Sequence, residues 1–137
     1  MRSLSWRLKT TLAAAEEASA NKDYAPALKG YQTLARDQAL PPSWRPFVAL
    51  RLALLYQQAR QPAVAAREFA QVATAADIPA TVKTTALTAL LRLSREGVPM
   101  QLPPELYATL LNMPGITPAD QFMVHLQFGH ALRRQGK

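Results

Sequence analysis

The sequence predicts an all-α protein of about seven helices that associate as antiparallel pairs. Three observations carry this prediction: apolar residues recur at helical spacing, prolines stand at the expected helix starts, and residues recur at an offset near 38. The composition agrees, because only five glycines occur in a chain rich in alanine and leucine. About half of the 137 residues are apolar, which is enough to bury the core of one domain.

Apolar residues three and four positions apart define seven segments that predict helices. These segments are 8–20, 24–34, 47–59, 63–73, 82–93, 106–113 and 122–132. A proline is tolerated in the first turn of a helix, where its missing N–H costs nothing, but it breaks a helix interior. Six prolines fall in an expected first turn: Pro26, Pro46, Pro62, Pro79, Pro104 and Pro118. Periodicity and prolines therefore predict the same helix starts.

Three of these starts also have a side chain suited to cap them. Asp23 precedes the second segment and Ser43 the third, and their side-chain oxygens can accept from free N–H groups of the first turn. Thr117 stands three residues before Asp120, which resembles a capping box with aspartate in place of glutamate. We predict N-caps at these three positions.

A repeat with an offset of 38 residues links different helices in one register. Ser5-Trp6-Arg7 recurs as Ser43-Trp44-Arg45. The same offset relates three further pairs, which are Ala27 and Ala65, Tyr31 and Phe69, and Leu34 and Val72. This register predicts helix pairs over 5–38, 43–76 and 80–113, then a lone helix over 118–136, in one domain covering 1–137. Since Trp6 and Trp44 are repeated, we expect both to pack one helix pair onto the next.

The lone helix has two interpretations. It either closes the third pair as a capping helix, or it begins a fourth pair within a longer repeat array. Its apolar side chains at Phe122, Met123, Leu126 and Phe128 favour the second interpretation. In that case its apolar face would be exposed in this chain.

These motifs resemble the tetratricopeptide repeat (TPR) family, whose pattern combines a leucine, a small residue and an aromatic in the first helix with a small residue and an aromatic in the second. Leu52-Ala53-x-x-Tyr56 and Phe128-Gly129-x-x-Leu132 match the first element, and Ala27-x-x-x-Tyr31 and Ala65-x-x-x-Phe69 match the second. The resemblance implies a right-handed α-solenoid of antiparallel helix pairs. The long turn over 98–104 and the period near 38, against about 34 in the family, depart from it.

A narrower resemblance comes from the phrase Asp37-Gln38-Ala39-Leu40-Pro41 followed by the helix 50–56. This phrase looks like the bacterial TPR-like domains of the ancillary translocon-subunit family. That resemblance implies a bacterial protein of an envelope, secretion or export assembly that binds other proteins.

The sequence holds no recognisable catalytic, cofactor or metal site. No cysteine is present, and His125 and His130 are five residues apart, which places them on different faces of a helix. Glu16 and Glu17 are neighbours that point in different directions. Neither a phosphate-binding glycine loop nor a nucleophile motif occurs. We therefore expect no enzyme activity, no cofactor and no metal.

The net charge of +7 favours nucleic acid or anionic surfaces only if the cations cluster. Instead they are spread along the chain, with Arg2, Arg7 and Lys9 near one end and Arg133, Arg134 and Lys137 near the other. No apolar stretch approaches the roughly 20 residues of a membrane span, and the start does not resemble a signal peptide. We expect a soluble chain, periplasmic or cytoplasmic.

The family resemblance implies that the first helix of each pair lines a concave, partner-binding face. The implied residues are Lys9, Leu12, Glu16, Phe47, Leu50, Leu54, Gln57, Gln58, Leu87, Leu91, Arg95, Leu126, His130 and Arg133. Such a face is apolar in the middle and basic toward the end, which suits a peptide or protein partner with an acidic end. Alternatively, Phe47, Leu50 and Leu54 are core residues.

The resulting prediction is a protein-interaction scaffold or adaptor. Two other readings stay open: a nucleic-acid-binding basic α-solenoid, and a structural spacer within a larger protein. Because alanine-rich helices with leucine stripes can also pair between chains, a homodimer is a further option.

Overall fold

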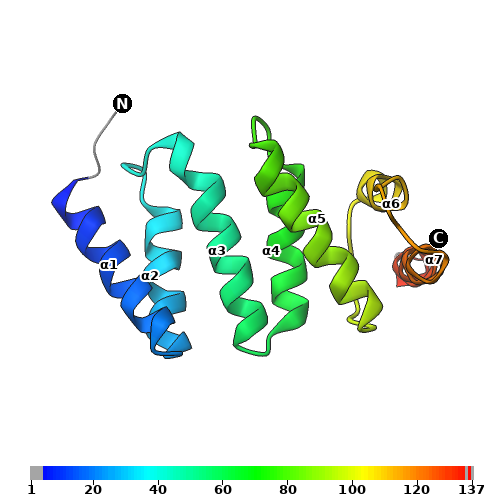
Figure 1. The fold of residues 1–137 in the computed structure, drawn as a ribbon, viewed down its shortest axis with the longest axis horizontal. Helices are drawn as coiled ribbons and strands as arrows, with labels where there is room; N and C mark the ends of the chain where they lie inside the picture. Colours follow the sequence, from blue (N-terminus) through cyan, green and yellow to red (C-terminus); the bar gives the residue numbers. More distant parts are fainter. Residues whose placement is uncertain (1–4, 135, 137) are drawn as a thin grey trace. The chain divides into compact units, whose positions relative to one another are not determined.

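The computed structural model describes residues 5–134 and 136, and this part of the chain is helical without strands. The helices are α1 (Trp6–Ala20), α2 (Tyr24–Arg36), the 3-10 helix η1 (Pro42–Trp44), α3 (Arg45–Gln58), α4 (Pro62–Thr74), α5 (Ala80–Arg95), α6 (Pro104–Leu111) and α7 (Pro118–Arg134) (Figure 1). The predicted all-α class is confirmed, and each of the seven predicted segments falls within or largely overlaps an α-helix.

The chain divides into two compact units, Met1–Glu68 (unit 1) and Phe69–Lys137 (unit 2), and each is described by itself below. The single repeat domain expected over 1–137 stays a prediction. Arg2 and Lys137, two of the terminal cations, lie outside the described residues, as does residue 135 of the expected last helix.

The helix starts follow the prolines closely. Pro62, Pro104 and Pro118 are the first residues of α4, α6 and α7, while Pro46 is the second residue of α3. Pro79 directly precedes α5. The predicted capping box is present, because Asp120 N donates to Thr117 Oγ1 at 3.1 Å and Thr117 N donates to Asp120 Oδ2 at 3.4 Å.

The N-cap predicted at Ser43 is wrong, because Ser43 lies inside η1 and Trp44 occupies the cap position of α3. The consecutive Pro41 and Pro42 favour a tight turn here, in which Trp44 N donates to Pro41 O at 2.9 Å. Asp23 does stand at the N-cap of α2, although its side chain makes no capping hydrogen bond. Ser5 caps α1 instead, with Oγ accepting from Leu8 N at 3.2 Å.

The repeated Ser-Trp-Arg triplet has a structural explanation in unit 1. Arg45 donates to Ala35 O at 3.2 Å and to Asp37 O at 2.9 Å, which satisfies free carbonyls at the end of α2. Arg7, the equivalent residue one repeat earlier, donates to the Asp37 carboxylate, and this hydrogen bond lowers the pKa of Asp37. Both arginines therefore tie the start of a first helix to the end of α2.

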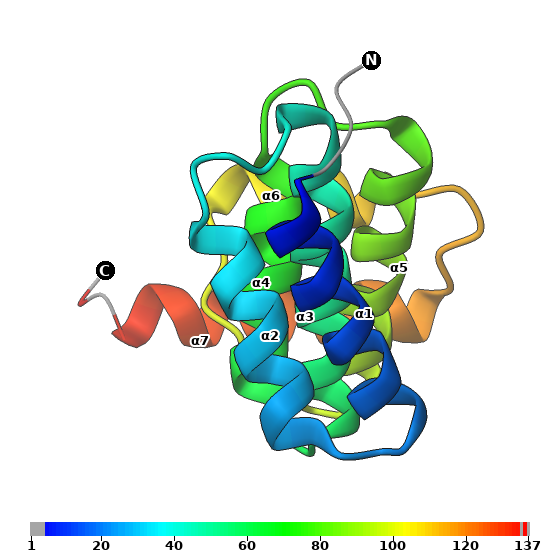
Figure 2. The same ribbon diagram turned by 90° about the vertical axis from the view of Figure 1, so that its left-hand side faces the viewer.

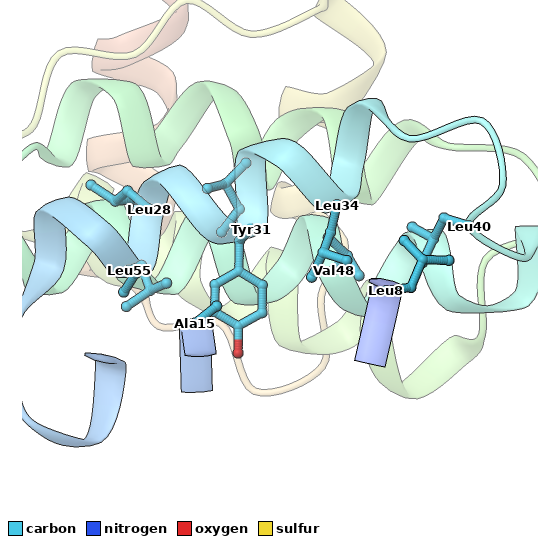
Figure 3. Close-up of a cluster of buried hydrophobic side chains, with 10 residues drawn as sticks. Leu8, Ala15, Leu28, Tyr31, Leu34, Leu40, Val48 and Leu55 are labelled. Carbon is cyan, nitrogen blue, oxygen red and sulfur yellow. The ribbon is translucent and has the colours of Figure 1, made fainter. Parts of the chain in front are cut away.

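The core of unit 1 joins α1, α2, α3 and the turn before η1. Figures 1 and 2 show α1 and α2 side by side as an antiparallel hairpin, and α3 also packs on α2. The core residues are Leu8, Ala15, Ala27, Leu28, Tyr31, Leu34, Leu40, Val48, Leu52 and Leu55 (Figure 3). Ala27 and Tyr31, the small residue and the aromatic of the repeat pattern, are 0% and 2% exposed. The pattern therefore predicts core positions correctly here.

The helices α1 and α2 approach each other tightly at Gly30. A Cβ added there would lie 2.7 Å from Ala15 Cβ, which is well inside van der Waals contact. Gly129, which the repeat pattern singles out, has no atom within 4 Å of its equivalent Cβ position. Close helix packing in this protein therefore depends on a glycine outside the recognised motif.

In unit 2, α7 packs against both α5 and α6. The helices α6 and α7 are seen nearly end-on in Figure 1, while α5 lies in the plane of the page, so α5 crosses them steeply. The sequence predicts instead that α5 and α6 form an antiparallel pair. The difference arises at 98–103, where the chain is extended and buried at Val98, Met100 and Leu102 and carries α6 away from α5.

Side chains of α6 and α7 hold this extended segment in place. Gln127 donates to Val98 O at 2.7 Å and accepts from Met100 N at 3.2 Å. The Tyr107 hydroxyl donates to Met100 O at 3.3 Å and accepts from Leu102 N at 3.2 Å, and its ring stacks on Phe128. Since an extended segment has no partner strand here, these side chains satisfy its buried backbone groups.

Candidate functional site

A hollow of about 290 Å³ opens on the surface of unit 1. Side chains from α1, α2, η1 and α3 line it. They are Leu12, Glu16, Tyr31, Trp44, Phe47, Val48, Leu50, Arg51 and Leu54. The lining is mainly apolar, with one carboxylate and one guanidinium. We call this hollow the unit 1 groove.

Helical spacing explains why these side chains share one surface. Leu12 and Glu16 are one turn apart on α1, and Phe47, Leu50 and Leu54 recur at three- and four-residue intervals on α3. Tyr31 and Val48 are 2% and 5% exposed and belong to the core beneath. Packing of α2 against both α1 and α3 therefore brings the side-chain stripes of α1 and α3 around one opening.

Two aromatic side chains in the unit 1 groove remain accessible. Phe47 is 52% exposed and Trp44 is 37% exposed. An aromatic ring left this accessible is not part of the core, and burying such rings is favourable when a partner covers them. The interpretation of Phe47 as a core residue is therefore wrong, whereas Leu50 and Leu54 are half-buried.

The structure brings five of the predicted partner-binding residues together in the unit 1 groove, namely Leu12, Glu16, Phe47, Leu50 and Leu54. Lys9 is exposed on α1 one turn before Leu12, outside the lining. Gln57 and Gln58 lie in the last turn of α3, also outside it.

Sequence reasoning missed four lining residues, Tyr31, Trp44, Val48 and Arg51. Trp44, Phe47 and Arg51 follow an i, i+3, i+7 spacing, which could have placed Trp44 and Arg51 on the same face as Phe47. The prediction that both tryptophans pack neighbouring pairs together is wrong for Trp6, which is 80% exposed. Repetition of a residue type alone does not require burial.

A second hollow, of about 300 Å³, opens on unit 2 and is called the α7 hollow below. It is lined by Gly97, Pro99, Met123, Leu126, Gln127, His130 and Arg134. Gly97 follows the end of α5 and has a φ of +76°, a conformation that glycine adopts without strain. The chain then continues to Pro99, which forms part of the wall of the hollow. Leu126 and His130 of the predicted set belong to this lining, and Arg133 donates to His130 Nδ1 at 2.8 Å.

Two predicted partner-binding residues are core residues instead. Leu87 and Leu91 of α5 are each 7% exposed. The buried residues of α5 are distributed around the helix and include Val82, Ala86, Ala89, Leu90 and Leu93. The helix is therefore covered on most sides. The assignment of Leu87 and Leu91 to an accessible face is therefore wrong.

Arg95, also predicted to bind a partner, is engaged within unit 2. Its Nε and Nη2 donate to the two carboxylate oxygens of Asp120 at 2.7 and 2.9 Å. Asp120 is 3% exposed, and the hydrogen bond from Arg95 is the main reason that its pKa falls from 3.8 to about 2. Arg95 therefore anchors the start of α7, although its side chain stays 58% exposed.

Across residues 5–134 and 136, no group of three or more histidine, cysteine or acidic side chains is arranged to hold a metal ion. None of the helices described there is long and apolar enough to span a bilayer. Comparisons with protein-family models, curated proteins and solved structures find no match to this chain.

Proposed function

We propose that this chain is a TPR-like protein-interaction module whose helices stack as a right-handed α-solenoid, and that the unit 1 groove binds a peptide or protein partner. The observation that carries the proposal is the accessibility of Phe47 and Trp44, 52% and 37% exposed, within a hollow whose lining is mainly apolar. Aromatic anchors in apolar pockets supply much of the binding energy at protein interfaces.

The energetics favour a partner with apolar side chains. Fully burying a phenylalanine or leucine side chain is worth roughly 1.5–3 kcal/mol. Part of the surface of Phe47, Leu50 and Leu54 is exposed in this chain and is available for a partner to bury. Glu16 and Arg51 supply one charge of each sign at the lining. These two charges favour a partner that carries complementary polar groups beside its apolar residues, such as an amphipathic helix or an extended peptide.

The proposed role is binding without catalysis. The groove lining holds one carboxylate, Glu16, and no histidine, serine or lysine, and its one phenol, Tyr31, is 2% exposed and belongs to the core. The resemblance of 37–41 and 50–56 to ancillary translocon-subunit domains makes a bacterial envelope, secretion or export assembly the proposed setting.

The experiment that tests this proposal is an affinity capture from the source organism's lysate with the wild-type chain and a Phe47→Ala/Leu54→Ala variant. Trp6→Ala is the matched control, because Trp6 is an exposed aromatic of unit 1 that does not line the groove. We expect a protein partner that is retained by the wild type and by the control but lost with the double variant. Circular dichroism confirms that all three remain folded.

Two outcomes would favour the other readings. If nuclease treatment removes the captured material and direct binding to nucleic acid falls steeply with salt, the chain binds nucleic acid. If the wild type and the double variant capture the same set, or nothing, the groove is not a binding site and a structural spacer is the better description.

A further inference from the structure

The α7 hollow has an apolar wall that is open to solvent. Met123 and Leu126 lie one turn apart on α7, and Pro99 faces them from the segment after α5. Leu126 is 39% exposed, and Phe122 extends the same stripe one turn earlier with 66% of its surface exposed. A hollow of about 300 Å³ is at the small end of ligand pockets, so it suits one or two side chains of a partner.

The opposite end of this stripe is cationic. His130 and Arg134 follow Leu126 at four-residue intervals on α7, and Arg133 lies beside them. Arg133 Nη2 contacts His130 Nδ1 at 2.8 Å, and because a guanidinium can only donate, Nδ1 is the acceptor and the ring's Nε2 carries the hydrogen. Arg134 is held by a hydrogen bond to Met100 O at 2.9 Å. The side chains at this end therefore offer only hydrogen-bond donors to a partner.

These arginines have no carboxylate partner within the described part of the chain. The ion pairs found there join Arg7 to Asp37 and Arg95 to Asp120. Asp120, at the other end of α7, is used by Arg95 and Thr117. Glu96 precedes Gly97 of the wall and is exposed, but it forms no ion pair with either arginine. An external carboxylate would complete the charge pattern.

A second copy of α7 is a poor occupant. In an antiparallel arrangement, Arg133 and Arg134 of one copy would approach the start of the other α7, where the acid of the first turn, Asp120, is already held by Arg95. In a parallel arrangement the arginines of the two copies would meet. Nucleic acid also fits less well, because its backbone calls for cations along a track, whereas these cations gather at one end of an apolar stripe.

We propose that the α7 hollow binds an acidic segment of a partner protein. An aliphatic side chain of that segment enters between Met123, Leu126 and Pro99. The acidic side chains of the same segment pair with Arg133, Arg134 and the Nε2 hydrogen of His130. This site lies wholly within unit 2 and does not depend on the function proposed for the unit 1 groove. It differs chemically from that groove, whose lining holds both an acid and a base.

Methyl and amide NMR titrations of the full chain test the proposal with defined peptides. The probes are acetyl-Leu-Leu-Asp-Glu-Asp-amide and the reversed order, acetyl-Asp-Glu-Asp-Leu-Leu-amide, with matched counterparts in which Asn and Gln replace the acids. We expect at least one acidic probe to shift the Met123 and Leu126 methyl signals. Its Kd should be about tenfold lower than that of its neutral counterpart, with the difference shrinking as salt rises.

Charge-removing variants test whether Arg133 and Arg134 contribute to the binding of the acidic probe. Arg133→Gln/Arg134→Gln should weaken binding of the acidic probe about tenfold, while Lys83→Gln, which removes an exposed cation of unit 2 away from the hollow, should leave it unchanged. Amide spectra establish that each variant is folded, and the Tyr107 hydroxyl still donates to Met100 O when Arg134 is replaced.

Several results would overturn the proposal. They are equal binding of acidic and neutral probes, an unchanged Kd in the double variant, absence of shifts with both probe orders, and tighter binding of an oligothymidylate at the same residues. Shifts confined to Leu12, Leu50 and Leu54 would also overturn it, while supporting the unit 1 groove. Failure of one site is thereby distinguished from failure of the other.

Discussion

At the scale of single residues, Asp120 shows how one side chain serves two purposes. Its carboxylate accepts from Arg95 of α5 and completes the capping box with Thr117. Capping and a charge-assisted hydrogen bond both act on the start of α7. Because Asp120 is 3% exposed, removal of its carboxylate also leaves Thr117 N and Arg95 without their partner.

We expect Asp120→Asn to lower the free energy of unfolding by about 2 kcal/mol at pH 7. The pKa of Asp120 is about 2 in the fold against an ordinary 3.8, so the carboxylate stabilises the fold above pH 4 and its contribution is lost as pH falls toward 2. Urea unfolding between pH 7 and pH 2.5 checks this. A difference between wild type and variant that stays constant over this range would contradict the assignment.

At the scale of helices, the α1–α2 hairpin depends on the absence of a side chain at Gly30. Gly30→Ala gains helix propensity, but its Cβ would lie 2.7 Å from Ala15 Cβ, an atom fixed to the backbone of α1. We expect a net loss of about 1–2 kcal/mol of stability, because the helices must move apart.

Gly129→Ala is the matched control for this change. No atom lies within 4 Å of the added Cβ, so helix propensity acts alone and the variant should gain roughly 0.5–1 kcal/mol. Thermal and urea unfolding of the two variants should therefore shift in opposite directions. A stabilised Gly30→Ala would mean that α1 and α2 separate without cost.

The extended segment between α5 and α6 depends on Gln127, which is 6% exposed. Gln127→Ala removes the partner of Val98 O and of Met100 N, and two buried backbone groups left unpaired cost about 2–4 kcal/mol. Hydrogen exchange of the Met100 amide should accelerate more than that of the α1 and α2 amides. Uniform acceleration across both units would show instead that the variant unfolds the chain globally.

At the scale of the whole molecule, mutations at exposed and at buried residues of the predicted partner-binding set should differ in their effects on stability and on binding. Leu91→Ala should cost about 2–5 kcal/mol of stability, because Leu91 is 7% exposed. Phe47→Ala, at a residue 52% exposed, should change stability by less than about 1 kcal/mol while weakening partner binding. Urea unfolding together with a binding assay checks both. A severe loss of stability in Phe47→Ala would make that residue structural.

The candidate sites could be predicted only in part. The family resemblance implied that Leu12, Glu16, Phe47, Leu50 and Leu54, which recur at helical spacing, share one face, and they do line the unit 1 groove. The same spacing describes Leu87 and Leu91, which are buried. A stripe of leucines looks alike in sequence whether solvent or another helix covers it, so exposure is not a local property.

The sequence by itself determined the helical class and the helix starts, because helical periodicity, prolines and the Thr117–Asp120 box act on neighbouring residues through the backbone. It also marked Ala27 and Tyr31 as core positions. Only the tertiary structure decided that α7 packs on both α5 and α6, that Arg95 is held by Asp120, and that Trp44 opens onto a groove. Each of these depends on which distant side chain fills the space beside a helix, and packing of that kind is set by the whole fold.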